Sequence, residues 1–194
     1  MKNLSYSLGM SMATQLMQTG LENLDVEAFV KAFTEIMKKE EPSMSLEEAT
    51  QHIQVYFSEK QNEMLQINKQ KGEQFLAENK KKENVVELPS GLQYEVLTEG
   101  DGPIPTATDT VQCHYHGTLI DGTVFDSSVQ RGEPAVFGVT QVIAGWVEAL
   151  QLMPVGSKWR LFVPSDMAYG EQGAGDIIQP NTTLIFEVEL LGIQ

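Results

Sequence analysis

The first twenty residues place apolar side chains with the period of an α-helix. Four of them recur at every fourth position, and they are Leu4, Leu8, Met12 and Leu16. This spacing puts them on one face of a helix, and Met10 and Met17 widen that face. Gly20 follows as the expected helix stop, because glycine readily adopts the left-handed conformation that ends many helices.

A second helix is predicted after Asp25, which has the residue type and the position of an N-cap. Its apolar face carries Phe29, Val30, Phe33, Ile36 and Met37. We expect it to end at Glu41-Pro42, because the residue before a proline disfavours the helical conformation. Short helices with such apolar faces indicate burial against a second copy of the chain, and packing against the C-terminal domain of the same monomer is the alternative.

A third, much longer helix is predicted to begin at Ser45. Ser45 and Glu48 have the spacing of a capping box, in which each side chain bonds the other residue's backbone N–H. No proline lies between Ser45 and about Asn84, and only Gly72 interrupts the pattern. Apolar positions become sparse in its second half, which is typical of a spacer. We therefore expect a helical dimerisation region over residues 1–44 and a connecting helix over 45–84.

The rest of the chain changes to the two-residue period of β-strands. Alternating or apolar runs predict strands over residues 92–97, 111–116, 158–163 and 184–191. Asp121-Gly122 is a typical hairpin turn, and residues 144–150 predict one short helix. An antiparallel sheet with a helix on one face is an α+β domain, and we expect this domain to span residues 85–194.

Charge and hydropathy exclude several classes of protein. The formal net charge is −14, and 3 basic against 14 acidic side chains give residues 85–194 a net charge of −11. Nucleic-acid binders and proteins held at anionic membranes need basic surfaces, so we expect neither partner. No stretch is apolar over the ~18 residues of a membrane span, and the N-terminus lacks a signal-peptide pattern. We expect a cytoplasmic protein, with a periplasmic protein that has lost its signal peptide as the alternative.

Cys113, His114 and His116 are the residues that most resemble a metal or nucleophile site. Alternate side chains of a strand face opposite sides, so the two histidines share one face and Cys113 lies on the other. These groups cannot converge on one ion, and we predict no metal, no cofactor and no cysteine nucleophile. A methionine-rich first helix raises copper binding as an alternative, but methionine more often fills apolar cores.

Apolar and aromatic side chains gather instead in and beside the loops of residues 85–194. One carboxylate, Asp126, lies among them. A concave apolar site with a few polar groups is typical of a ligand pocket, while the same residues would also serve as an ordinary core. The pattern leaves both interpretations open for Tyr115, Phe125, Phe137, Val142, Ile143, Trp146, Tyr169, Ile177, Ile178 and Phe186.

Four motifs in this half closely resemble those of FKBP-type peptidyl-prolyl cis-trans isomerases, in the family's order and near its spacing. They are Val124-Phe125-Asp126-Ser127-Ser128, Val142-Ile143-Ala144-Gly145-Trp146, Ala168-Tyr169-Gly170 and Ile177-Ile178-Gln179-Pro180. The N-terminal half is similar to the group of Mip (macrophage infectivity potentiator) and FklB, which joins such a domain to a helical dimerisation region. That likeness rests on the long helix, on Leu4-Ser5-Tyr6-Ser7-Leu8-Gly9 and on Leu88-Pro89-Ser90-Gly91-Leu92-Gln93-Tyr94.

The resemblance implies a strongly bent antiparallel sheet wrapped around one short helix, with the catalytic pocket between them. Trp146 would be its floor, and the walls would be Tyr115, Phe125, Val142, Ile143, Tyr169 and Phe186. Asp126 and the Tyr169 hydroxyl would be its polar groups, Ile143 would offer its backbone N–H, and Arg131 would pair with Asp126. The other implied substrate-binding residues are Phe137, Ala168, Ile177 and Ile178.

The implied activity is isomerisation of X–Pro bonds in unfolded or nascent polypeptides. Amide resonance opposes this rotation with a barrier of ~18–20 kcal/mol, and a dry aromatic pocket favours the twisted amide, so no nucleophile is required. The implied assembly is a homodimer through the N-terminal helices, and a rapamycin-type macrolide is an implied ligand. Ala174 and Ala135 stand where many members have a histidine and an aromatic residue, which predicts a less enclosed site for it.

Two other functions stay open from the sequence. A folding chaperone that holds unfolded segments, with incidental isomerase activity, is the main alternative, because proline catalysis does not need the helical arm. A structural assembly factor that acts through its helices would not need an intact pocket.

Overall fold

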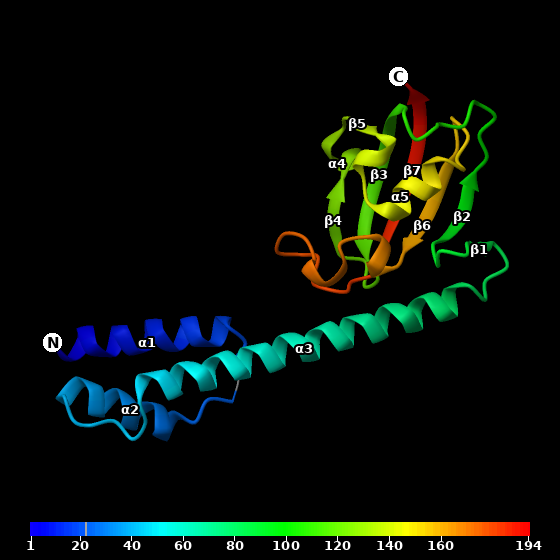
Figure 1. Ribbon diagram of the computed structural model, residues 1–194. Coiled ribbons are helices and arrows are strands. Elements are labelled where there is room, and N and C mark those ends of the chain that lie inside the picture. Colours follow the sequence, from blue (N-terminus) through cyan, green and yellow to red (C-terminus); the bar gives the residue numbers. More distant parts are fainter. Residues whose placement is uncertain (22) are drawn as a thin grey trace. The chain divides into compact units, whose positions relative to one another are not determined.

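The computed structural model describes residues 1–21 and 23–194, which form two compact units, Met1–Tyr56 and Phe57–Gln194 (Figure 1). The first unit contains α1 (Lys2–Gln18), α2 (Val26–Lys38) and the first part of α3 (Leu46–Asn79). The second contains the rest of α3 and an antiparallel sheet that curves around a short helix. The predicted fold class, a helical arm with a long helix followed by an α+β domain, is confirmed.

The starts of α2 and α3 are capped as predicted. Asp25 Oδ1 accepts a hydrogen bond from the Ala28 N–H at 3.0 Å. Ser45 Oγ accepts one from the Glu48 N–H at 3.2 Å, while the Ser45 N–H donates to Glu48 Oε2 at 2.8 Å. These side chains satisfy N–H groups that the first helical turn leaves without a partner.

The ends of these helices come earlier than the sequence predicted. α2 stops at Lys38, because Lys39 adopts the left-handed conformation with φ at 61° and its N–H bonds the Ile36 carbonyl at 3.1 Å. The predicted end at Glu41-Pro42 is therefore wrong, since the helix is capped before the proline can act. α3 ends at Asn79 instead of continuing to residue 84.

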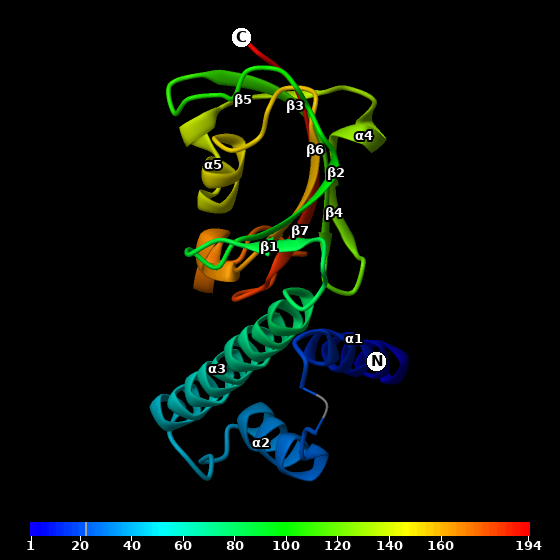
Figure 2. The ribbon, with the colours of Figure 1, turned by 90° about the vertical axis from the view of Figure 1, so that its right-hand side faces the viewer.

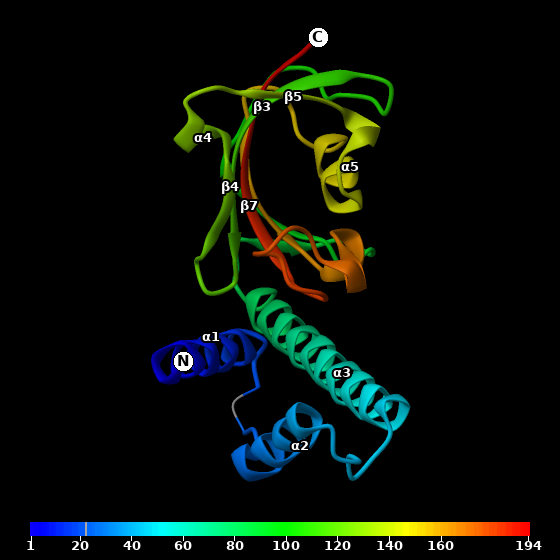
Figure 3. The same ribbon diagram turned by 90° about the vertical axis from the view of Figure 1, so that its left-hand side faces the viewer.

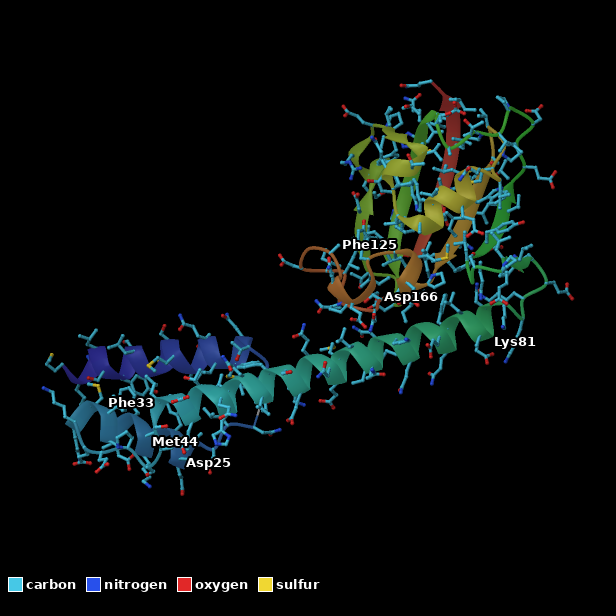
Figure 4. All side chains as sticks on the ribbon, in the orientation of Figure 1. Asp25, Phe33, Met44, Lys81, Phe125 and Asp166 are labelled. Atoms are coloured by element: carbon cyan, nitrogen blue, oxygen red, sulfur yellow. The ribbon has the colours of Figure 1, made fainter. Side chains whose placement is uncertain are left out.

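Neither α1 nor α2 contains a buried residue in the described structure. A cavity of about 910 Å³ lies between their apolar faces, and Phe33 points into the space beside α1 (Figure 4). We call this cavity the arm groove; its lining includes Leu8, Met12, Leu16, Phe29 and Phe33. The Phe33 side chain is 47% exposed, so the helical arm has apolar faces without a core of its own.

The sheet has the strand order β1-β2-β6-β7-β3-β4, with β5 paired to β3, and every pairing is antiparallel. Its strands are β1 (Val85–Glu87), β2 (Gln93–Thr98), β3 (Thr110–Leu119), β4 (Val124–Ser127), β5 (Ala135–Gly138), β6 (Lys158–Val163) and β7 (Leu184–Ile193). Figures 2 and 3 show how the sheet bends around α5 (Ala144–Leu150). The core therefore lies between the concave face of the sheet and this helix.

The two-residue alternation along β3 has the predicted orientation. Cys113 and Tyr115 are buried on the concave side. His114 and His116 face the opposite side, where their Nδ1 atoms lie 3.1 Å from Ser128 Oγ and 3.0 Å from Ser127 Oγ. Only the concave face of this strand therefore contributes to the core.

The second half of α3 belongs to the same compact unit as the sheet. Its Phe75 ring lies 6.0 Å from that of Phe162, and Asn79 Nδ2 donates to Gln93 Oε1 at 2.9 Å. Gln93 Nε2 in turn donates to the Leu76 carbonyl at 2.9 Å, and both polar side chains are almost completely buried. This part of the helix packs as a component of the domain, and the division at residues 84 and 85 stays a prediction.

Removal of the Asn79 amide should destabilise the domain. We expect Asn79→Ala to lower the free energy of unfolding by ~1–3 kcal/mol, because Gln93 keeps a buried carbonyl without its donor. Urea denaturation measures this loss. Gln66→Ala, at an exposed position of the same helix, is the matched control, and an equal change in both variants would contradict the prediction.

Candidate functional site

A cavity of about 660 Å³ lies between the concave face of the sheet, the start of α5 and the loop before β7. It brings together all the predicted site residues except Arg131 and Ala168. Its lining consists of Tyr115, Phe125, Asp126, Phe137, Gln141, Val142, Ile143, Trp146, Tyr169, Ala174, Gly175, Asp176, Ile177, Ile178 and Phe186. The residues that the sequence left open between core and pocket thus line one concave surface.

Trp146 forms the floor, in the first turn of α5. Its ring makes edge-to-face contacts with Tyr115, Phe137 and Phe186, at centroid distances of 5.5, 5.7 and 5.3 Å. Such contacts add to the stability of burial and fix the ring planes. Its indole N–H is buried without a partner among the described residues, a cost that this aromatic packing must outweigh.

Phe125 forms one wall from β4, near the loop that precedes β7 (Figure 4). Its ring meets Phe186 edge to face at 5.4 Å. Gly117 of β3 provides the space, since a Cβ atom there would lie 2.6 Å from the Phe125 ring and 3.1 Å from Phe186. Gly117 was not predicted from the sequence, although a lone glycine within a strand often marks a close approach.

Asp126 is one of two carboxylates in the cavity lining, the other being Asp176, and two donors hold it. It accepts hydrogen bonds from the Tyr115 hydroxyl and from Arg131 Nη1. Arg131 Nη2 also donates to the Tyr115 hydroxyl at 2.9 Å, and its guanidinium lies 5.6 Å from the centre of that ring. Arg131 is therefore outside the cavity lining but makes the pair with Asp126 that the resemblance implied.

The short helix α4 (Ser128–Arg131) explains how Arg131 reaches this carboxylate. Ser127 Oγ accepts from the Gln130 N–H at 3.2 Å and caps its start. Gly132 ends it in the left-handed conformation, with φ at 75°. The single helical turn of α4 thus brings Arg131 back beside Asp126.

These contacts shift the titration of the three side chains. Burial raises the pKa of Tyr115, and its hydrogen bond to Asp126 raises it further. Partial burial acts to raise the pKa of Asp126, but hydrogen bonds from Tyr115 and Arg131 and the Arg131 charge outweigh it and lower the pKa. Asp126 is therefore ionised at neutral pH and suited to accept hydrogen bonds, whereas a carboxylate with a lowered pKa is a weak base.

Ala168 lies outside the lining, at the end of the 3-10 helix η2 (Ser165–Met167), where it packs against the core. The next residue, Tyr169, does line the cavity. Three lining residues were not predicted, because their short segments have no periodicity and no motif singles them out. They are Gln141, which ends the 3-10 helix η1 (Val139–Gln141), and Gly175 and Asp176 in the loop before β7.

Comparison with known proteins gives two family matches. Residues 102–191 match the model described as FKBP-type peptidyl-prolyl cis-trans isomerase. Residues 1–96 match the domain amino terminal to FKBP-type peptidyl-prolyl isomerase. The two matches together extend over both compact units.

Relatives align over nearly the whole chain. The FKBP-type 22 kDa peptidyl-prolyl cis-trans isomerase of Escherichia coli is 48% identical over 97% of this chain and 93% of its own length. Outer membrane protein MIP of Legionella longbeachae is 42% identical over 98% of this chain and 84% of its own. The crystal structure of FkpA from Escherichia coli matches with a TM-score of 0.84 and 33% identity, over 100% of this chain and 94% of that chain.

The comparisons give no support to the expected cytoplasmic location, since one relative is named as an outer membrane protein. Among the helices of the described residues, none is long and apolar enough to cross a membrane.

Replacing Tyr115 should change the titration of Asp126. In Tyr115→Phe we expect the pKa of Asp126 to move up toward its ordinary value, because one donor to the carboxylate is lost. Carboxyl carbon NMR titration measures it. A lowered carboxylate pKa contributes stability above the ordinary value of ~3.9 that is lost as the pH falls through the folded-state pKa, and this contribution should shrink in the variant.

The matched control is Tyr169→Phe, which removes the other hydroxyl in the cavity lining. It should leave the Asp126 titration unchanged, because the described contacts of Asp126 do not include Tyr169. An unchanged pKa in Tyr115→Phe would show that the hydroxyl does not hold the carboxylate.

Proposed function

The chain belongs to the FKBP-type peptidyl-prolyl cis-trans isomerases, and we propose that the aromatic cavity above Trp146 is its catalytic site. The protein accelerates the exchange of X–Pro bonds between cis and trans. The observation that supports this location is the cage of edge-to-face rings around Trp146, with one held, ionised carboxylate at its edge. The described lining contains no serine, cysteine, histidine or lysine, and this reaction needs no such nucleophile.

The cavity suits the electronic change that rotation brings. The planar amide owes its ~18–20 kcal/mol barrier to resonance, which separates charge between oxygen and nitrogen. The twisted amide has less of this separation, so an apolar enclosure favours it relative to the planar ground state. We assign the rings of Trp146, Phe125 and Phe186 to hold the prolyl ring while the bond turns.

Hydrogen bonds would hold the backbone on either side of that bond. The Ile143 N–H, at the N-cap of α5, has no hydrogen bond to the described residues, and we assign it to a substrate carbonyl. Asp126 is ionised and would accept a substrate N–H, while the Tyr169 hydroxyl supplies a second polar group in the lining. The bound segment would thus be kept in a turn-like geometry, without proton transfer.

The rim of the cavity favours apolar partners. Ile177 is 45% exposed on the loop over the cavity, beside Ile178. Peptides with an apolar residue before proline should therefore be preferred substrates. A rapamycin-type macrolide is a candidate ligand for the same surface, and Ala174 in the lining leaves the site less enclosed for it.

The helical arm suits a homodimer. Its apolar side chains are exposed in the single chain, and contiguous apolar surface of this kind typically marks an interface. We therefore assign the arm groove to the arm of a second copy. An unfolded polypeptide that contacts two catalytic domains binds the second at a high effective concentration, which a short peptide cannot do.

The cavity is tested by Phe125→Ala compared with Asp126→Asn. We expect Phe125→Ala to lower kcat/KM by about tenfold or more, because the wall above Trp146 is lost. Asp126→Asn should cost less than the ~10²–10⁴-fold of a lost general base, since the amide keeps one acceptor oxygen. A proline-peptide assay measures both, and added rapamycin should inhibit the wild type.

Val136→Ala on the neighbouring strand β5 is the control, because that side chain is exposed and outside the cavity lining. Full activity in a folded Phe125→Ala variant would refute the pocket as assigned. A loss of general-base size in Asp126→Asn, with a pH profile that follows a carboxylate, would show that Asp126 transfers a proton.

The arm is tested by Phe33→Asp in the full chain. A carboxylate in the arm groove should prevent burial against a second copy, so light scattering should show a monomer. Peptide isomerisation should stay close to wild type, while acceleration of proline-limited protein refolding should fall about tenfold or more as avidity is lost.

Ala32→Asp adds the same charge at the neighbouring exposed position and should leave the dimer intact, since Ala32 does not line the groove. A monomeric wild type would contradict the dimer. Refolding activity that survives in a monomeric Phe33→Asp would instead favour a chain that acts alone.

A further inference from the structure

The loop over the cavity, residues 173–183, carries several lining residues and is here named the pocket loop. Its tip is closed by two backbone bonds, from the Ala174 N–H to the Ile178 carbonyl at 2.8 Å and from the Ile178 N–H to the Ala174 carbonyl at 3.1 Å. Ile177 and Ile178 lie within this segment and line the cavity. Their position therefore depends on what holds the base of the loop.

Asn181 holds the base of the pocket loop from within the domain. It adopts the left-handed conformation with φ at 56°, and its N–H donates to the Gly170 carbonyl at 2.8 Å. Asparagine tolerates this conformation better than most residues. Its side chain is buried, so the amide needs hydrogen-bond partners inside the protein.

The partners come from helix α3, more than a hundred residues earlier in the sequence. Asn181 Nδ2 donates to the Leu65 carbonyl at 3.3 Å, and Asn68 Nδ2 donates to the Pro180 carbonyl at 2.9 Å. Leu65 and Asn68 lie one turn apart on the part of α3 that belongs to the sheet unit. Two side-chain amides thus join the helix to the base of the loop. One hydrogen bond is donated from the loop to the helix, and the other from the helix to the loop.

Gly72 allows this close approach one turn further along α3. A Cβ atom at Gly72 would lie 3.2 Å from the Thr183 Cβ and still closer to its hydroxyl, at the end of the pocket loop. Glycine within a helix costs about 1 kcal/mol relative to alanine, so its position in α3 calls for a packing reason. Contact with Thr183 supplies that reason.

We propose that Asn68 and Gly72 of α3 are positioning residues of the catalytic site, which set how closely Ile177 and Ile178 cover the substrate residue before proline. The proposal rests on the assigned function of the cavity. Phe75 and Asn79 hold the same helix to β6 and β2, independently of the loop. The Asn68 bond instead meets the loop at Pro180, two residues after Ile178, so its loss should act on substrate binding.

The test compares three α3 or loop variants with Asn79→Ala, which removes a buried bond from the same helix to the sheet. Asn68→Leu keeps the side-chain size without the donor. Asn181→Gly keeps the left-handed backbone without the amide, and Gly72→Ala pushes Thr183 away from the helix. All four are measured in the full chain, so each has an intact helix and arm.

We expect Asn68→Leu and Asn181→Gly to raise KM about fivefold for peptides with leucine before proline, the ratio that one lost hydrogen bond typically gives, and to leave kcat nearly unchanged. Gly72→Ala should change KM without changing kcat, because it displaces Thr183 at the end of the pocket loop, and a wild-type KM in this variant would remove Gly72 from the proposal. Peptides with alanine before proline should change less, because a methyl group reaches the loop poorly. Amide exchange at Ile178 should quicken, since that N–H bonds within the loop. Asn79→Ala should lower stability without changing KM or this exchange.

Wild-type KM and wild-type Ile178 exchange in both Asn68→Leu and Asn181→Gly would overturn the proposal. An equal rise of KM in Asn79→Ala would overturn it too, because the effect would then reflect general destabilisation. An inactive wild type would refute the assigned function of the cavity instead, and the exchange measurement would still decide whether α3 positions the loop.

Discussion

The edge-to-face packing of Trp146 is the interaction on which the rest of the domain depends. Its three partners come from different strands, Tyr115 from β3, Phe137 from β5 and Phe186 from β7, so one side chain fixes α5 against the whole bend of the sheet. The same rings then form the floor and walls of the cavity. The sequence left core and pocket as alternatives, but the same aromatic rings belong to both. A substitution in this cluster therefore alters the packing of the core and the shape of the pocket together.

Electrostatics in the α+β domain are set by a shortage of cations. Residues 85–194 contain Arg131, Lys158 and Arg160 against 14 acidic side chains. Lys158 and Arg160 pair with Glu187 at 2.9 and 2.7 Å, and Arg131 pairs with Asp126. Each cation therefore has a specific acidic partner, and Arg131 contributes to the lowered pKa of Asp126. That arrangement provides a fixed acceptor at the edge of an apolar cavity, which suits a reaction that changes no covalent bond.

Regular periodicity predicted the long elements, and local motifs predicted most of the cavity. The short β1, β4 and β5 strands and the four-residue α4 were missed, because three or four residues show too little of either period. Gly117 was missed for another reason: its role depends on the Phe125 and Phe186 rings that the fold brings against it. α3 looked like a spacer because its apolar positions are sparse. Its contacts with the domain use Phe75 together with polar side chains and a glycine, and a hydrophobic pattern does not detect the polar side chains or the glycine.

The two compact units differ in how far a single chain buries their apolar side chains. The unit with the sheet buries a continuous core and encloses its cavity with its own residues. The helical arm has no buried residue in α1 or α2 and leaves apolar faces exposed. Burial of apolar surface is the main favourable term in folding, so the proposed dimer would stabilise the arm by burying these faces. Catalysis by the domain and the proposed association through the arm then use separate sets of residues, and among the described helices α3 is the one that contributes to both units.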